Sequence, residues 1–183
     1  MDEKKYSESS IQFAMRTLAT TENPDEETEN YFRHSTDPVA LYALGFIGKK
    51  FKDSPRGEKI SKDLLEQYKN EASNEKKEML LEAIGNTGSK EVFKLLKEHQ
   101  DSPSMLLALR YVEGERALNI LLNSMHGKNQ VYALSALTMR LPAGILEEEH
   151  RNFIENSLKN LEEAKTNSPL QSQLKENLKY FNR

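Results

Sequence analysis

The sequence predicts an all-α fold made of antiparallel helix pairs stacked in chain order. Apolar residues recur at helical spacing, and the plainest example has them at i, i+3, i+4 and i+7: Ile11, Ala14, Met15 and Leu18. Five of the six prolines directly follow a residue that caps helix N-termini. No stretch alternates apolar and polar residues for long enough to predict a β-strand. These three observations favour helices from end to end.

Length and composition fit such a stack. A chain of 183 residues is long enough for one continuous core, so we expect a single helical-repeat domain over 1–183, with 1–7 a disordered end. The hydrophobic share is 37%, and adding the 8 glycines leaves it below the ~45–50% typical of globular domains. An elongated stack exposes more surface per residue than a compact globule, which accounts for the low apolar share.

The charge balance and the apolar runs restrict the partners. The formal net charge is −3, from 26 basic and 29 acidic residues. Because nucleic-acid-binding proteins normally carry a basic face, we expect no nucleic-acid partner. The longest apolar stretch, 39–48, is about half of what a membrane span needs, so we expect no transmembrane segment. Without cysteine or an apolar signal core, the compartment stays unknown: cytoplasmic if the chain is full-length, or exported if it is a fragment.

Prolines next to capping residues place five helix starts: Asn23-Pro24, Asp37-Pro38, Ser54-Pro55, Ser102-Pro103 and Ser168-Pro169. Proline is tolerated at the first helical position because its missing N–H would be unpaired there. The sixth proline, Pro142, ends a helix. With the apolar spacing, these marks predict about eleven helices: 8–20, 24–33, 38–51, 57–71, 75–86, 89–99, 103–111, 114–125, 128–141, 146–164 and 169–182.

The stretch 80–100 predicts two short helices with a tight joint. Gly85 and Gly88 bracket the joint, because a helix C-terminus favours a residue that tolerates positive φ. Ser89 can then cap the second helix. The apolar face of that helix consists of Val92, Leu95 and Leu96. Such a pair cannot bury its apolar face alone, so we expect similar pairs on both sides.

An internal echo supports the repeat interpretation. The segment 43–48, ALGFIG, matches 83–88, AIGNTG, and both end a predicted helix. Ala-Leu pairs occupy the same place in two later helices, at 108–109 and 136–137. The simpler alternative is that Ala-Leu pairs occur in any helix. The coincidence with predicted helix ends favours repeats, because repeat joints belong there.

Four segments carry a resemblance to a known class of helical repeats: LYALGFIG, LLEAIGNTGSKEVFKLL, LLALRYVEGERALNILL and YALSALTMRLP. Each reads as the end of a first helix and a short turn, and the middle two continue into a second helix with paired leucines. They resemble the HEAT and armadillo-like family over about 37–161. The resemblance implies a HEAT-like α–α solenoid, a right-handed superhelix. It also implies a non-enzymatic scaffold that binds a protein or peptide partner on its concave face.

One narrower similarity gives an alternative. The order AIGNTGSKEVFKLL, LLALRYVEGERALNILL and ALTMRLP is similar to the helical domain of vitellogenin-type large lipid-transfer proteins. In that family a helical repeat layer forms a structural shell beside lipid-carrying sheets. This chain is too short to contain such sheets. The alternative function is therefore a helical shell fragment of a lipid-transfer protein.

The sequence contains no pattern that predicts catalysis. It has no HExxH, GxSxG, GxxxxGK or GxGxxG motif. Glu147 is spaced to share a helix face with one histidine, but a carboxylate-bridged metal site needs a second such pair. The histidines lie on different predicted helices or joints: His34, His99, His126 and His150. We therefore expect no enzyme activity, no metal and no cofactor.

Two groups of polar residues are candidates for binding a partner. In HEAT-like stacks the second helix of each pair lines the concave side, and here those helices expose Lys94, Lys97, Arg116, Asn119 and Asn123. The resemblance implies that these five residues contact the protein or peptide partner. The other group is a basic run: Lys49, Lys50, Lys52, Arg56, Lys59 and Lys62. A solvated face is the simpler interpretation of that run, and a contact site for an acidic partner is the alternative.

Both predicted terminal helices have a one-sided apolar stripe. In the helix 169–182 that stripe consists of Leu170, Leu174, Leu178 and Phe181. An isolated stack needs polar outer faces on its end helices, and one-sided helices supply them. We therefore expect the protein to be a monomer.

Overall fold

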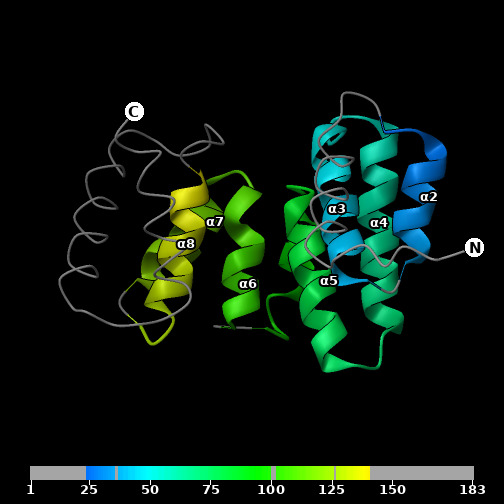
Figure 1. The fold of residues 1–183 in the computed structure, drawn as a ribbon. Coiled ribbons are helices and arrows are strands. Elements are labelled where there is room, and N and C mark those ends of the chain that lie inside the picture. Colours follow the sequence, from blue (N-terminus) through cyan, green and yellow to red (C-terminus); the bar gives the residue numbers. More distant parts are fainter. Residues whose placement is uncertain (1–23, 36, 100–101, 126, 141–183) are drawn as a thin grey trace, which may run out of the picture. The chain divides into compact units, whose positions relative to one another are not determined.

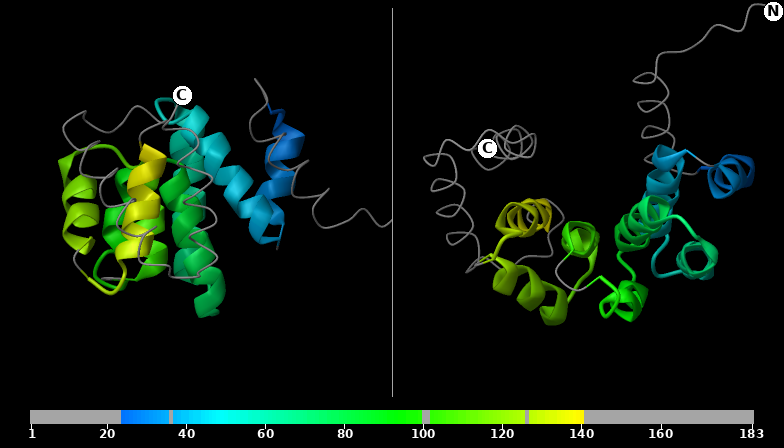
Figure 2. Two further views of the ribbon diagram at one scale, coloured as in Figure 1. Left: turned by 60° about the vertical axis from the view of Figure 1, so that its left-hand side comes forward. Right: turned by 90° about the horizontal axis from the view of Figure 1, so that it is seen from below.

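The computed structural model describes residues 24–35, 37–99, 102–125 and 127–140. The chain divides into two compact units, Met1–Glu91 and Val92–Arg183, and each has its own arrangement of helices. The described residues form helices and turns without a strand, which confirms the all-α class (Figures 1 and 2). The expected disordered end, Pro142 and the expected helices at 8–20, 146–164 and 169–182 lie outside the described residues. The prediction of one domain over 1–183 stays a prediction.

Four α-helices form the described part of the first unit: α2 (Glu26–His34), α3 (Pro38–Lys50), α4 (Pro55–Asn70) and α5 (Asn74–Asn86). Helix α3 packs against the other three, and α4 also packs against α5 (Figure 1). The largest side chains that these helices bury completely are Phe32, Leu44, Ile47, Ile60, Leu64, Leu81 and Ile84. Helix α3 is therefore the central element of this unit.

The second unit is built around its last described helix. Its elements are η1 (Lys90–Leu95), which begins at the unit boundary, α6 (Pro103–Ala108), η2 (Leu109–Tyr111), α7 (Glu115–Ser124) and α8 (Gln130–Arg140). Helix α8 packs against α6, η2 and α7. Large apolar side chains buried between these elements are Leu106, Leu109, Leu121, Leu134 and Leu137.

Three of the predicted helix starts are confirmed. The side chains of Asp37, Ser54 and Ser102 accept hydrogen bonds from backbone N–H groups two or three residues later, at 2.8, 3.4 and 3.1 Å. A proline follows each of them at the first position of α3, α4 and α6. These caps satisfy N–H groups that have no partner inside the helix.

The predicted start at Asn23-Pro24 is wrong by two residues. The N-cap of α2 is Asp25, whose Oδ1 accepts a 2.7 Å hydrogen bond from the backbone N–H of Thr28. Hydrogen bonds from the Thr28 side chain and backbone lower the pKa of the Asp25 carboxyl. Asp25 is a good cap because its carboxylate reaches the N–H groups of the first turn and is favoured by the helix dipole. Pro24 therefore lies before the cap.

The joint after α5 depends on Gly88 and not on Gly85. Gly88 has φ 73°, and its N–H donates to the carbonyl of Gly85 at 2.9 Å. Gly85 is the second-last residue of α5, within the predicted span 75–86, and the positive φ of this joint occurs at Gly88 instead. Ser89 accepts a hydrogen bond from the N–H of Glu91 at 3.2 Å, as the capping prediction requires.

The segment after this joint is a 3₁₀ helix over Lys90–Leu95, which corrects the predicted α-helix over 89–99. A 3₁₀ helix has about three residues per turn, so side chains at i and i+3 share one side. Val92 and Leu95 have this spacing, and both are buried as predicted. Leu96 is only half-buried, because it lies in the turn beyond the helix.

The two segments of the sequence echo pack against each other. A Cβ atom added at Gly45 would lie 2.5 Å from the carbonyl oxygen of Ala83 and 2.9 Å from Cβ of Asn86. A Cβ added at Gly48 would lie 2.9 Å from Cγ2 of Thr87. Both glycines therefore allow α3 to approach α5 more closely than any other residue would.

The echo does not mark equivalent helix ends. Gly48 lies inside α3, which continues to Lys50, whereas Gly88 lies beyond α5. The Ala-Leu pair at 136–137 also lies inside a helix, because α8 continues to Arg140. The pair at 108–109 does lie at a helix end, where α6 tightens into η2. The shared residue types at 43–48 and 83–88 thus accompany a contact between two helices.

A partly buried group of charges connects α2 to α4. Glu29 is 7% exposed, accepts a hydrogen bond from Nε of Arg56 at 2.7 Å, and is ion-paired with Arg33. Nη2 of Arg56 donates to the carbonyl of Pro24 at 2.7 Å. Arg33 is also ion-paired with Asp63 on α4. The two arginines thus neutralise a carboxylate that would be costly to bury alone.

A buried arginine connects α8 to the end of η2. Arg140 is 1% exposed, and its Nη1 donates to the carbonyls of Leu109 at 2.9 Å and Val112 at 2.6 Å. Burial lowers the pKa of its guanidinium, and the charge of Glu113 opposes this shift. These hydrogen bonds satisfy carbonyl groups at the end of a helix, which have no N–H partner inside the helix.

We expect Gly45→Ala to lower the free energy of unfolding by about 1–3 kcal/mol, because the added methyl group collides with the backbone of α5. At an open helical position the same change would stabilise by about 0.5–1 kcal/mol, so the sign of the effect is informative. Urea denaturation followed by circular dichroism measures it. The matched control is Gly127→Ala, whose Cβ would meet only a carbonyl oxygen at 3.8 Å. Equal or higher stability of Gly45→Ala would contradict the close contact.

We expect Arg140→Leu to lower the free energy of unfolding by about 1.5–3 kcal/mol, since it removes two hydrogen bonds from a charged donor. The same denaturation experiment measures this loss. Lys128→Leu, at an exposed position of the same unit, is the control for adding a leucine in place of a basic residue. If both variants have the wild-type stability, Arg140 does not support the end of η2.

Candidate functional site

The five predicted partner-binding residues lie on two neighbouring segments of the second unit. Lys94 is in η1, Lys97 is in the turn after it, and the other three are on α7. All five are exposed: Lys94, Lys97, Arg116, Asn119 and Asn123. The α7 residues are at i, i+3 and i+7, so they share one side of the helix. We call these five residues the contact face.

One cation–π contact and one shared pocket connect these segments. The guanidinium of Arg116 lies over the ring of Phe93 in η1, 4.5 Å from its centroid, which is a favourable cation–π distance. Further along, Lys97 and Asn123 line the same pocket. Phe93 precedes Lys97 in the first segment, and Arg116 precedes Asn123 in the second. Lys94 and Asn119 lie between these positions in the chain, and the role of the five residues in binding a partner stays a prediction.

The pocket at the end of the contact face has an apolar interior and a polar edge. We call it the α6–α7 pocket; its volume is about 330 Å³, and its lining is Leu96, Lys97, Met105, Leu106, Ile120, Asn123 and Ser124. Met105 and Leu106 are each 1% exposed, so they are the most buried of its apolar residues. Leu96 and Ile120 are half-buried, whereas Lys97 and Asn123 are exposed.

The polar groups of this pocket provide both donors and an acceptor. The Ser124 hydroxyl donates to the carbonyl of Ile120 at 2.9 Å, so its oxygen keeps its accepting capacity. The Asn123 amide offers two N–H donors and an oxygen acceptor, and Lys97 offers an ammonium group. Lys97 is also the one formally charged side chain among the seven lining residues. The lining therefore combines apolar surface with a single positive charge.

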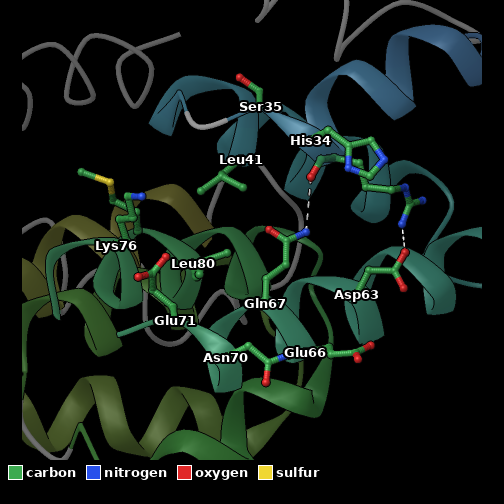
Figure 3. A pocket seen from close by; sticks show the side chains of 12 residues that line it. His34, Ser35, Leu41, Asp63, Glu66, Gln67, Asn70, Glu71, Lys76 and Leu80 are labelled. Carbon is green, nitrogen blue, oxygen red and sulfur yellow. Dashed lines mark hydrogen bonds and ion pairs between the residues drawn. The ribbon is translucent and has the colours of Figure 1, made fainter. Parts of the chain in front are cut away.

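The first unit contains a larger and more polar pocket, shown in Figure 3. Its volume is about 610 Å³, and its lining is Arg33, His34, Ser35, Leu41, Asp63, Glu66, Gln67, Asn70, Glu71, Lys76, Met79 and Leu80. Figure 3 shows the amide of Gln67 directed at the backbone of α2, where it donates to the carbonyl of Arg33 at 3.5 Å. Helices α2, α4 and α5 supply most of this lining.

Several charged side chains that line this larger pocket form ion pairs or hydrogen bonds within the protein. Arg33 and Asp63 form an ion pair between α2 and α4 (Figure 3). Glu71 accepts hydrogen bonds from the backbone N–H groups of Ala72 and Ser73, at 2.9 Å each. The bond from Ser73 is the main reason why the pKa of Glu71 is lowered. These groups stabilise the α2–α4 contact and the turn before α5, which makes the α6–α7 pocket the better candidate for a partner site.

Two of the five predicted partner-binding residues, Lys97 and Asn123, lie at the edge of the α6–α7 pocket, and the sequence did not predict its apolar lining. Met105 and Ile120 are apolar residues of α6 and α7, and residues of this kind usually lie in a core. They line a pocket because η1 ends at Leu95, so that Leu96 and Lys97 flank the opening from a turn. Nothing in the sequence indicates that η1 ends at Leu95, because the apolar pattern is regular over 89–99.

The described ranges contain neither a cluster of metal ligands nor a membrane-spanning helix. No three histidine, aspartate or glutamate side chains there gather closely enough to hold a metal ion. His34 lines the larger pocket and His99 follows η1, while His126 and His150 lie outside the described residues. None of the described helices has the length and apolar character needed to cross a bilayer.

No family model, no curated protein and no solved structure matches this chain. The resemblance to HEAT and armadillo-like repeats therefore stays an expectation from the residues alone. A function for the chain has to be argued from the contact face and the α6–α7 pocket.

Proposed function

We propose that this chain is a non-enzymatic scaffold that binds a protein or peptide segment through the contact face and the α6–α7 pocket. The observation that carries this proposal is the meeting of Lys97 and Asn123, from two separate segments, at the edge of an apolar pocket. Protein interfaces have this arrangement at their strongest points, with a buried apolar anchor surrounded by polar groups.

The proposal includes the architecture that the sequence resembles. We propose a HEAT-like right-handed superhelix of about eleven helices, in one domain that behaves as a monomer. In the first unit each described helix packs against the next in the chain, and α3 also packs against α5, which supports a stack of neighbouring pairs. In such a stack α7 is the second helix of its pair, and its exposed side would face the partner.

The contact face also supplies chemistry suited to a peptide. Lysine and arginine attract acidic groups, and asparagine side chains pair with peptide N–H and C=O groups. Arg116 is held by Phe93, which reduces the conformational entropy that its side chain loses when a partner binds. The proposed partner is therefore a polypeptide, and the proposal involves no metal, cofactor or nucleic acid.

We expect random-library peptides selected on the full chain to bind the Lys97→Ala/Asn123→Ala variant at least about 10-fold more weakly, which corresponds to about 1.4 kcal/mol. Fluorescence anisotropy with labelled peptides gives the Kd. The matched control is Asn30→Ala/Lys128→Ala, which changes one exposed asparagine and one exposed lysine elsewhere. Control and wild type should bind equally.

Two outcomes would count against the scaffold proposal. One is a selection that yields no binding peptide. The other is a set of peptides whose affinity is the same for wild type and the Lys97→Ala/Asn123→Ala variant. Flotation with phosphatidylcholine vesicles addresses the alternative of a lipid-associated shell, because binding lost in the same variant would favour that alternative.

A further inference from the structure

We infer that the α6–α7 pocket takes one large apolar side chain of the partner, and that Lys97 pairs with a carboxylate next to that side chain in the partner sequence. The inference rests on the proposed function and names the chemistry of the bound segment. It is carried by the composition of the pocket lining and by the position of its single charge.

The lining requires an apolar occupant. Leu96 and Ile120 are half-buried, so their remaining exposed surface is still in contact with water. An apolar side chain in the pocket would remove that surface from water, which is the main source of affinity at protein interfaces. Met105 is among the most buried lining residues and is unbranched and polarisable, so it can adjust to an aliphatic or an aromatic occupant.

The size of the pocket restricts that occupant to a single anchor. Its volume of about 330 Å³ lies near the lower end of the ~300–1,000 Å³ range of ligand sites. One leucine, methionine or phenylalanine side chain fits such a space, together with the water or backbone near the opening. The flanking residues of the partner would then lie outside, over Lys97 and Asn123.

The charge of the lining requires an acidic neighbour. A lysine beside an apolar pocket loses water when a partner covers it, and that loss is favourable only if an anion replaces the water. Lys97 is the charged member of the lining, and Lys94 and Arg116 add positive charge on the same two segments. These segments also carry three acidic residues, Glu91, Glu98 and Glu115, but none of them lines the pocket.

The peptide backbone next to the anchor has partners at the same edge. The Asn123 amide can donate to a carbonyl and accept from an N–H group, and the Ser124 oxygen can accept another hydrogen bond. These groups have no preference between side chains, so they would position the segment without selecting its sequence. Selectivity would then come from the apolar anchor and the acidic neighbour.

Charge reversal at Lys97 tests this inference. The peptides selected on the full chain should contain a large apolar residue within about one or two positions of an aspartate or glutamate. Lys97→Glu should weaken such a peptide at least about 10-fold, and changing the acidic residue of that peptide to lysine should restore most of the affinity. The matched control, Lys128→Glu, reverses an exposed charge that is not in the lining and should bind like wild type. Restored binding cannot come from a misfolded variant.

A second variant tests the apolar anchor. Ile120→Gln should lower the affinity for the selected peptide. Changing the apolar anchor of the peptide to alanine should lower its affinity for the wild type strongly. The same peptide change should lower the affinity for Ile120→Gln only slightly, because the pocket no longer favours an apolar side chain. A contrary result is a set of selected peptides that bind the Lys97→Ala/Asn123→Ala variant more weakly than wild type, yet show no rescue of Lys97→Glu by an acidic-to-lysine change and no effect of the apolar anchor. That result would overturn the inference and leave the scaffold proposal standing. A library that yields no binders would overturn both.

Discussion

The contact between α3 and α5 organises the first unit. Two glycines on α3, Gly45 and Gly48, face α5 at a distance that leaves no room for a Cβ atom. The contact buries the polar side chains of Asn86 and Thr87 completely, and α4 packs against both helices. Thr87 stays satisfied because its hydroxyl donates to the carbonyl of Ile84 at 2.6 Å. Close packing of backbones thus sets the geometry to which the other helices of this unit conform.

Charged groups have different roles in the two units. In the first unit, Arg33, Arg56 and Glu29 lie between α2 and α4, where their ion pairs and hydrogen bonds hold the helices together. In the second unit, Arg140 supports the end of η2, while Lys97 remains at the edge of the α6–α7 pocket. An exposed positive charge next to apolar surface is a feature that binding a partner explains.

The α6–α7 pocket follows from how the second unit is packed. Helix α8 covers α6, η2 and α7 from one side. The pocket is lined by the turn after η1 together with α6 and α7, and α8 contributes no residue to it. The 3₁₀ helix ends at Leu95, and the apolar lining residues that keep exposed surface beyond it are Leu96 and Ile120. A partner would complete the packing on this side without rearranging the core.

The sequence by itself determined the helical class and the starts of α3, α4 and α6. These features depend on interactions within about one helical turn, such as a cap or an apolar stripe, and such interactions can be read from neighbouring residues. The tertiary structure decided the role of Gly45, the 3₁₀ form of η1 and the existence of the α6–α7 pocket. Each of these depends on atoms far away in the chain: the tolerance for a Cβ at Gly45, for example, is set by the carbonyl of Ala83 on another helix.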